Sequence, residues 1–149
     1  MKARKGFTLV EILIVVVILG ILAAIVIPQF TEASTEAKTS SLCTDLQTVR
    51  SQIELYKIQH NDDMPGTVAG VTFEQALTQK TDQAGNLDAS GQYGPYLQKI
   101  PSNPFAASDV ANTVATGPED AAVSDAAGWY FETDTGEFNA VDSAEHLAL

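Results

Sequence analysis

The sequence contains a single cysteine, Cys43, so no disulfide bond can form within one chain. In an oxidising compartment an unpaired thiol is free to pair with another molecule. Free cysteines are nevertheless often buried, where they behave as small hydrophobic side chains. Because Cys43 lies beside a periodic apolar stripe described below, we expect it to be buried, with pairing to a second chain as the alternative.

Basic side chains are also scarce. The 149 residues include 8 Lys and Arg against 19 Asp and Glu, which gives a net charge of −11. Binding to nucleic acid requires a basic surface that neutralises phosphates. The charge balance therefore argues against a nucleic-acid partner, and the length leaves room for one domain plus an anchor.

The residues that usually carry catalysis are few. His60 and His146 are the only histidines in the sequence. We find no Ser/His/Asp order with supporting motifs, no Cys/His zinc spacing and no Gly-rich phosphate-binding loop. We therefore predict that the chain is not an enzyme and requires no cofactor.

What the sequence does contain is one long apolar run, from Phe7 to Ile27, which Pro28 follows. Its 21 residues match the roughly 20 that a helix needs to span a bilayer. A cleaved secretory signal has a shorter apolar region, of about 7–15 residues, and ends at a small-residue cleavage site. The basic peptide of residues 1–6 places the N-terminus in the cytoplasm by the positive-inside rule. A plain signal-anchor helix is the alternative to a cleaved signal, but it leaves Gly6-Phe7 and Glu11 unexplained.

At the start of this run, Gly6-Phe7-Thr8-Leu9-Val10-Glu11 closely resembles the type IV pilin and pseudopilin family. The fit extends over residues 5–30 and includes Pro28, which closes the segment expected to pack in a filament. The resemblance implies that a prepilin peptidase cuts between Gly6 and Phe7 and methylates the new Phe7 amine. Cleavage would remove three basic residues and leave five against 19 acidic ones, a net charge of −14.

Glu11 is the one acid in the apolar run, which contains no Lys, Arg or His. A carboxylate inside hydrocarbon or a helix bundle is costly unless it is paired. The nearest cation is the amino group that cleavage frees at Phe7. By the resemblance, Glu11 pairs with the Phe7 amine of a neighbouring subunit, which would set the axial register of the helices. Pairing within one chain, or a place at headgroup level that favours the helix N-terminus, are the alternatives.

Three later motifs resemble a narrower group, the major pseudopilins of type II secretion systems. They are Tyr96-Leu97-x-x-Ile100-Pro101-x-Asn103-Pro104, Gly128-Trp129-Tyr130-Phe131 and Thr135-Gly136-Glu137-Phe138. The resemblance implies a structural subunit of a periplasmic pseudopilus that drives protein export from the inner membrane. It implies as partners further copies of the chain, minor pseudopilins, prepilin peptidase and the inner-membrane assembly platform.

Two other functions stay open. A type IV pilin of a surface filament would serve adhesion, motility or DNA uptake. Such pilins often close a C-terminal loop with a disulfide, which a single cysteine forbids. The second alternative is a membrane-anchored binding protein that never polymerises.

Major pseudopilins often bind calcium in a C-terminal loop of acidic residues and backbone carbonyls. Residues 139–146 do not reproduce that loop, although Asp134, Asp142 and Glu145 could supply oxygen ligands. Calcium takes about six to eight oxygens. Isolated carboxylates usually stay in water, and we therefore expect a solvated acidic face in preference to a calcium site.

The hydrophobic pattern predicts an α+β fold, in which a small C-terminal domain with a short helix and an antiparallel β-hairpin or small sheet packs on a long N-terminal helix. The helix is expected from Phe7 to Gln59, with a membrane-spanning half at residues 7–28 and an amphipathic half at residues 29–60. Pro28 should kink it. The amphipathic half carries an apolar stripe at alternating spacings of four and three: Leu42, Leu46, Val49, Ile53 and Tyr56.

Residues 29–149 are predicted to form one periplasmic domain, in which residues 61–149 cover the stripe. Thr72 should cap a short helix over 72–80. Strands at 128–133 and 137–141 should form a hairpin, and residues 106–127 a long loop. The predicted cover consists of Phe73, Leu77, Tyr96, Leu97, Ile100, Trp129 and Phe131.

Overall fold

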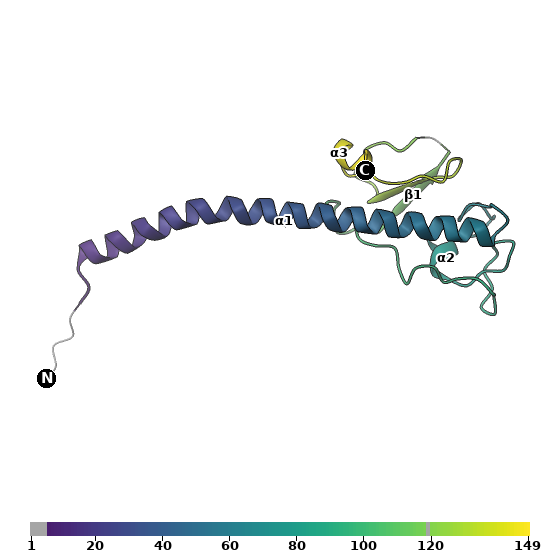
Figure 1. Ribbon diagram of the computed structural model, residues 1–149, viewed down its shortest axis with the longest axis horizontal. Coiled ribbons are helices and arrows are strands. Elements are labelled where there is room, and N and C mark those ends of the chain that lie inside the picture. Colours follow the sequence, from purple (N-terminus) through teal and green to yellow (C-terminus); the bar gives the residue numbers. More distant parts are fainter. Residues whose placement is uncertain (1–5, 119) are drawn as a thin grey trace. The chain divides into compact units, whose positions relative to one another are not determined.

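The computed structural model describes residues 6–118 and 120–149, so the predicted leader, apart from Gly6, lies outside the described residues. The elements follow the chain as α1 (Leu9–Gln59), α2 (Phe73–Thr78), β1 (Val114–Gly117), β2 (Trp129–Glu132), β3 (Phe138–Ala140) and α3 (Ala144–Leu147), as Figure 1 shows. The predicted α+β class is confirmed. The chain divides into two compact units, unit 1 (Met1–Thr39) and unit 2 (Ser40–Leu149).

Helix α1 begins two residues after the predicted start because Thr8 caps it. The Glu11 amide lies 3.3 Å from Thr8 Oγ1, and the Thr8 amide donates to the Glu11 carboxylate at 2.7 Å. This reciprocal pair satisfies amide groups that have no partner within the helix. Pro28 lies inside α1, which continues through it as one helix to Gln59.

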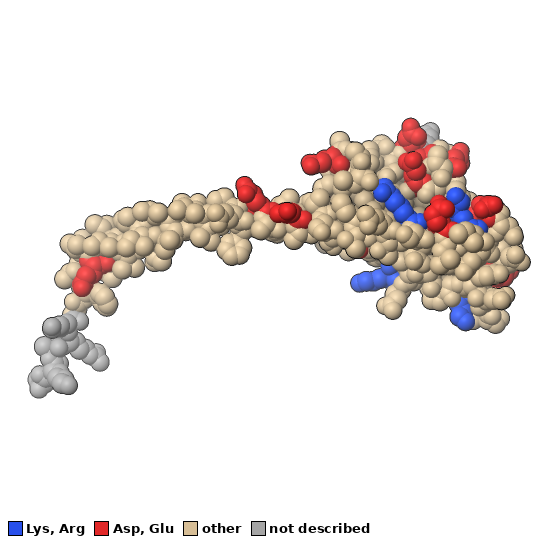
Figure 2. All heavy atoms as spheres, viewed as in Figure 1, with Lys and Arg blue, Asp and Glu red and all other residues tan. Residues whose placement is uncertain are grey.

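Within unit 1, α1 presents apolar side chains on every side. The large hydrophobic residues from Phe7 to Phe30 are 42% to 83% exposed. Figure 2 shows most of this stretch as a surface without Lys, Arg, Asp or Glu. By length and composition, α1 can cross a membrane.

Unit 2 is built around the second half of α1. All five residues of the predicted stripe are buried, none more than 1% exposed. The predicted cover is confirmed, because its members either belong to the same buried cluster or, like Tyr96 and Leu97, pack against it. Ala76, Phe138 and Ala140 complete the cluster. Figure 1 shows α2 and the sheet beside this half of the helix.

The sheet has three strands in the order β1-β2-β3. Strands β2 and β3 form the predicted antiparallel hairpin, with Phe131 opposite Phe138. The prediction of a loop over residues 106–127 is wrong at Val114–Gly117, which pairs in parallel with β2. This strand lies at the edge of the sheet, and two of its four residues are exposed. Backbone hydrogen bonds to β2 hold it in place. Its side chains do not alternate between buried and exposed, so the sequence shows no clear strand pattern here.

Two short helices have side-chain caps. Thr72 caps α2 as predicted, because its hydroxyl oxygen accepts from the Gln75 amide at 3.2 Å and the Gln75 side chain accepts from the Thr72 amide. Helix α3 was not predicted. The Ser143 hydroxyl oxygen accepts from the His146 amide at 3.2 Å and so begins α3 within the acidic tail.

Candidate assembly helix and C-terminal polar cluster

The predicted processing site lies at the open start of α1. Phe7 is 83% exposed. In the described part of the chain, nothing lies within 4 Å of the place that a side-chain carbon would take at Gly6. A peptidase can therefore reach the bond between Gly6 and Phe7 without displacing another described segment.

Glu11 bonds to Thr8 within the single chain. Its Oε2 atom accepts from the Thr8 amide at 2.7 Å and from the Thr8 hydroxyl at 2.8 Å. In the single chain the carboxylate thus caps its own helix, and the side chain stays exposed. The spacing Thr8-x-x-Glu11 is that of a capping box, so the sequence held the signal for this contact.

Pro28, the second residue predicted to serve assembly, is exposed inside α1. It has no amide proton, so the carbonyl of Ala24 loses its usual helical donor. Close by, the Thr31 hydroxyl donates to the Ile27 carbonyl at 3.2 Å. The apolar side chains around them are uncovered, and full burial of each contributes about 1.5–3 kcal/mol. Contact with lipid tails or with other apolar helices is therefore strongly favoured.

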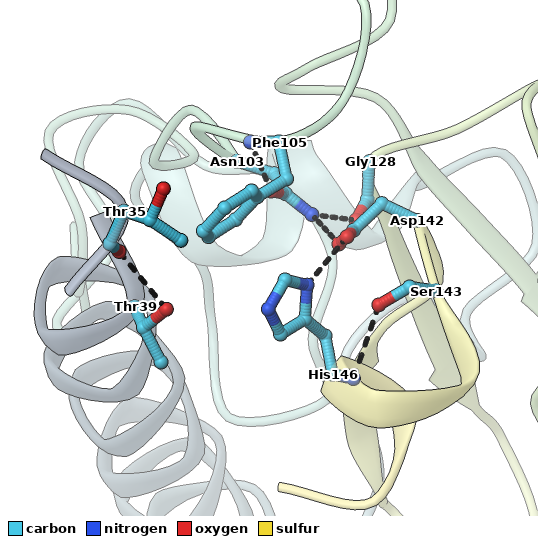
Figure 3. Close-up of polar contacts among 8 residues, drawn as sticks. All are labelled: Thr35, Thr39, Asn103, Phe105, Gly128, Asp142, Ser143 and His146. Atoms are coloured by element: carbon cyan, nitrogen blue, oxygen red, sulfur yellow. Dashed lines mark hydrogen bonds and ion pairs between the residues drawn. The ribbon is translucent and has the colours of Figure 1, made fainter. Parts of the chain in front are cut away.

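Asp142 belongs to a polar cluster at the base of α3, drawn in Figure 3. Its Oδ1 accepts from Asn103 Nδ2 at 2.6 Å, and its Oδ2 lies 2.5 Å from His146 Nδ1. The side chains of Asp142 and His146 are 8% and 12% exposed. Asn103 also bonds to the Gly128 carbonyl and the Phe105 amide. Asp142 therefore ties the tail to the segment before β1.

The other two candidate calcium ligands lie elsewhere on the surface. Asp134 is exposed in the turn between β2 and β3, and Glu145 is exposed in the first turn of α3. Among residues 6–118 and 120–149, no group of three or more His, Cys, Asp or Glu is placed to hold a metal ion. The three candidates therefore do not converge, and both carboxylate oxygens of Asp142 already have partners.

Arg50 was not singled out from the sequence. From α1 its guanidinium donates to the Phe138 carbonyl at 2.9 Å, to Asn139 Oδ1 at 2.9 Å and to the Leu149 carbonyl at 3.1 Å. These bonds fasten the last strand and the tail to the helix. A single Arg on an amphipathic helix forms no sequence pattern from which these hydrogen bonds could be predicted.

His60 is a buried structural residue. It stacks on Tyr56 with ring centroids 3.8 Å apart, and its Nε2 atom lies 2.9 Å from the Thr81 hydroxyl. Burial, together with the negative charges of Asp63 and Asp82, raises the pKa of Tyr56 to about 12. This packing closes the end of α1 against the loop that follows α2.

Cys43 is a free thiol and only half-buried. The prediction that it is buried is therefore met in part. Its place on α1 lies next to Leu42, which is fully buried.

The comparisons with known proteins agree with this geometry. Residues 1–27 match the family model described as the prokaryotic N-terminal methylation motif. The chain is 36% identical over 107 residues to the type II secretion system core protein G of Pseudomonas aeruginosa, covering 70% of each chain. It is 30% identical over 105 residues to the protein of that name from Klebsiella pneumoniae, covering 70% of this chain and 71% of the relative.

A third relative with the same name, from Vibrio cholerae, is 31% identical over 105 residues, covering 70% of this chain and 68% of the relative. No solved structure matches the chain. Relatives at this identity and coverage, together with the methylation motif at the start of an apolar helix, determine the family. The chain belongs to the type II secretion system core protein G family of pseudopilins.

Proposed function

We propose that the chain is a structural subunit of a type II secretion pseudopilus and has no enzymatic activity of its own. The observation that carries the proposal is the helix that follows Gly6 and Phe7, whose large apolar side chains are 42% to 83% exposed. Such a surface requires a bilayer before assembly and other helices after it. Relatives named type II secretion system core protein G support the same function.

Processing comes first in this proposal. A prepilin peptidase cuts between Gly6 and Phe7 on the cytoplasmic side and methylates the Phe7 amine. The basic leader sets the orientation, so α1 crosses the inner membrane once and unit 2 lies in the periplasm. Prepilin peptidase, the assembly platform of the inner membrane and minor pseudopilins are the proposed partners besides further copies of the chain.

Assembly then uses Glu11. In the single chain its carboxylate caps α1, which leaves it at the helix end close to Phe7. In the filament, the amine of a neighbour's first residue replaces water around that carboxylate. The pair repays the cost of burying the charge and fixes the axial register of one helix against the next.

The proposal also holds that no cofactor is needed. Both oxygens of Asp142 are bonded to Asn103 and His146, and these bonds already hold the tail in place. Asp134 and Glu145 remain solvated acids.

Intact-mass measurement on the full chain tests the processing step. In cells with an active prepilin peptidase, we expect a mature protein that begins at Phe7 and carries one added methyl group. Gly6→Val should block cleavage because the residue before the cut can no longer be glycine. Ala33→Val, which places the same side chain at an exposed position within α1, should be cleaved normally. A mature N-terminus at Met1, or one beyond Ile27, would contradict the proposal.

A further inference from the structure

Strand β1 has one edge that no other described strand covers. The sheet order is β1-β2-β3, so β2 lies on one side of β1 and the other side is open. Because β1 runs parallel to β2, alternate residues of β1 direct their main-chain groups toward it. The Thr113 carbonyl accepts from the Trp129 amide at 3.1 Å, and the Gly117 carbonyl accepts from the Thr133 amide at 2.8 Å. These odd-numbered residues therefore bond on the β2 side.

Val114 and Thr116 present their amides and carbonyls to the open edge instead. In the part of the chain that the structure describes, no group bonds to these two amides and two carbonyls. An open edge is a template for another strand, and proteins usually block it with charge, proline or a covering segment. Residues 114–117 contain neither a charge nor a proline, and Pro118 directly after them ends the edge.

A hollow of about 380 Å³ lies beside this open edge. Val114 and Thr116 line it from β1, and Phe73 and Glu74 line it from α2. Phe73 is held in the core, with the centroid of its ring 4.5 Å from that of Phe131, so this part of the lining is fixed. Strand addition uses such a geometry, because main-chain bonds along an edge give affinity and a neighbouring pocket takes side chains of the added strand.

Charge indicates which kind of strand fits the hollow. Glu74 is exposed, and it is the one charged residue among the described residues that line the hollow. A Lys or Arg on the added strand would therefore meet an opposite charge. A second copy of this chain is a poor match, since it would bring another Glu74 and a net charge of −11 to the same edge.

We propose that the open edge of β1 binds an extended segment of a different protein, which adds a fourth strand to the sheet. The segment pairs its backbone with Val114 and Thr116, places small or apolar side chains in the hollow and carries a Lys or Arg that pairs with Glu74. Because β1 offers four main-chain groups, the binding is weak and reversible. The contact uses no residue of α1, so it does not rest on the proposed function.

Binding of a synthetic peptide to the full chain in detergent tests this proposal. The probe is a short fluorescent peptide of alternating threonine and valine with one central lysine. We expect saturable binding, measured as a rise in fluorescence polarisation, and changes in the amide NMR signals of Val114 and Thr116. The same peptide with a methyl group on every backbone nitrogen cannot donate to a strand edge and should not bind.

Variants of the protein locate the site. Glu74→Gln removes the charge in the hollow and should weaken binding of the lysine peptide about threefold, as expected for an exposed ion pair. Glu137→Gln, the same change at an exposed residue directly before β3 on the other edge of the sheet, should leave binding unchanged. Thr116→Pro removes an amide that bonds to no described residue, so it should abolish binding and leave the unfolding temperature close to that of the unchanged chain.

The outcomes are distinct. No saturable binding of the lysine peptide, equal binding of the N-methylated peptide, or equal losses from Glu74→Gln and Glu137→Gln would each overturn the proposed site, even if Thr116→Pro failed to fold. A photo-reactive residue at position 116 that crosslinks the chain to itself, at twice the subunit mass, would show that a second copy occupies the edge and would also overturn it. None of these measurements requires a filament, so failure of the proposed function would leave their results unchanged.

Discussion

At the scale of single residues, Glu11 has one role in the isolated chain and a different one in the proposed filament. Bonded to the amide and hydroxyl of Thr8, it is part of a helix cap. A cap of this kind accepts glutamine as well as glutamate at the third helical position. Capping therefore does not require the negative charge. A carboxylate buried within an apolar run is costly unless a cation pairs with it.

Glu11→Gln separates these two roles. The amide keeps the capping geometry, so insertion and cleavage should proceed, whereas the buried pair with a neighbour's Phe7 amine is lost at a cost of about 3–5 kcal/mol. Filament yield, measured after shearing and corrected for processed subunit, should fall strongly. As a control, Thr8→Ala removes the cap at a cost of about 1 kcal/mol and keeps the charge. Equal yields from Glu11→Gln and the unchanged chain would mean that Glu11 does not set the register.

Two tyrosines of unit 2 should ionise at a higher pH than a free tyrosine does. Burial, followed by the charges of Asp63 and Asp82, raises the pKa of Tyr56 to about 12. Burial also raises the pKa of Tyr96 to about 12, with smaller contributions from Tyr56 and Tyr93. In the unfolded chain tyrosine has a pKa of about 10. The folded state therefore keeps protons that the unfolded state loses, so this stability is complete below about pH 10 and is lost as pH rises toward 12.

Absorbance of tyrosinate during an alkaline titration measures this effect. Two of the four tyrosines should titrate only near the pH at which unit 2 unfolds. In Tyr96→Phe, one of the two late steps should disappear. Titration of all four tyrosines near pH 10 in folded protein would show that Tyr56 and Tyr96 are not held as described.

At the scale of elements, α1 carries three different surfaces along one helix. The apolar run of unit 1 is exposed on all sides, and in unit 2 a buried stripe lies opposite an exposed face that includes Thr44, Ser51 and Ile58. The stripe belongs to the core, because its five members form one buried cluster with residues of α2, of strands β2 and β3, and with Ile100. The same helix therefore serves as an anchor and as one wall of the core.

Alanine substitutions should distinguish the two faces of α1 in unit 2. Leu46 is 1% exposed in the core, and Leu46→Ala should lower the free energy of unfolding by about 2–5 kcal/mol, since it leaves a cavity. Ile58→Ala, at a residue that is 76% exposed, should change it by less than about 0.5 kcal/mol. Urea unfolding followed by circular dichroism measures both. Similar losses in the two variants would place Ile58 in the core.

At the scale of the whole molecule, stability and assembly are divided between the two units. Unit 2 contains the complete hydrophobic cluster, from Leu42 to Ala140, with its own sheet and helices. Unit 1 contributes a helix without buried side chains. The part that folds by itself and the part that requires a membrane or a filament are thus separate along the chain.

A fragment that starts at residue 29 should therefore be a folded monomer. Trp129 is fully buried and its Nε1 donates to the Pro101 carbonyl at 2.9 Å, so its fluorescence should shift to longer wavelength only on unfolding. Calcium or a chelator should leave the unfolding temperature unchanged, because Asp142 is already bonded within the protein. Gel filtration and thermal unfolding with and without calcium measure both points. If calcium raises the unfolding temperature by several degrees, a calcium site at or near Asp134, Asp142 and Glu145 is indicated instead.

Periodic features were predictable because they repeat at the spacing of the structure that they form. The stripe from Leu42 to Tyr56, the hairpin around Gly136 and the cap at Thr72 all depend on residues a few positions apart. The cap at Thr8 is equally local, because Thr8 and Glu11 have the spacing of a capping box, but it was not among the predicted caps.

The sequence by itself determined the apolar helix, its single acid, the residues on either side of the expected cleavage and the buried face of α1. Each of these depends on composition or on a short repeat of apolar residues, which can be recognised in the sequence without knowledge of the fold. Only the tertiary structure decided the pairing of β1 with β2, the bond from Arg50 to Phe138 across 88 positions and the bond from Asn103 to Asp142 across 39. These contacts join segments far apart in the chain, and no local pattern marks a partner that folding alone brings within reach.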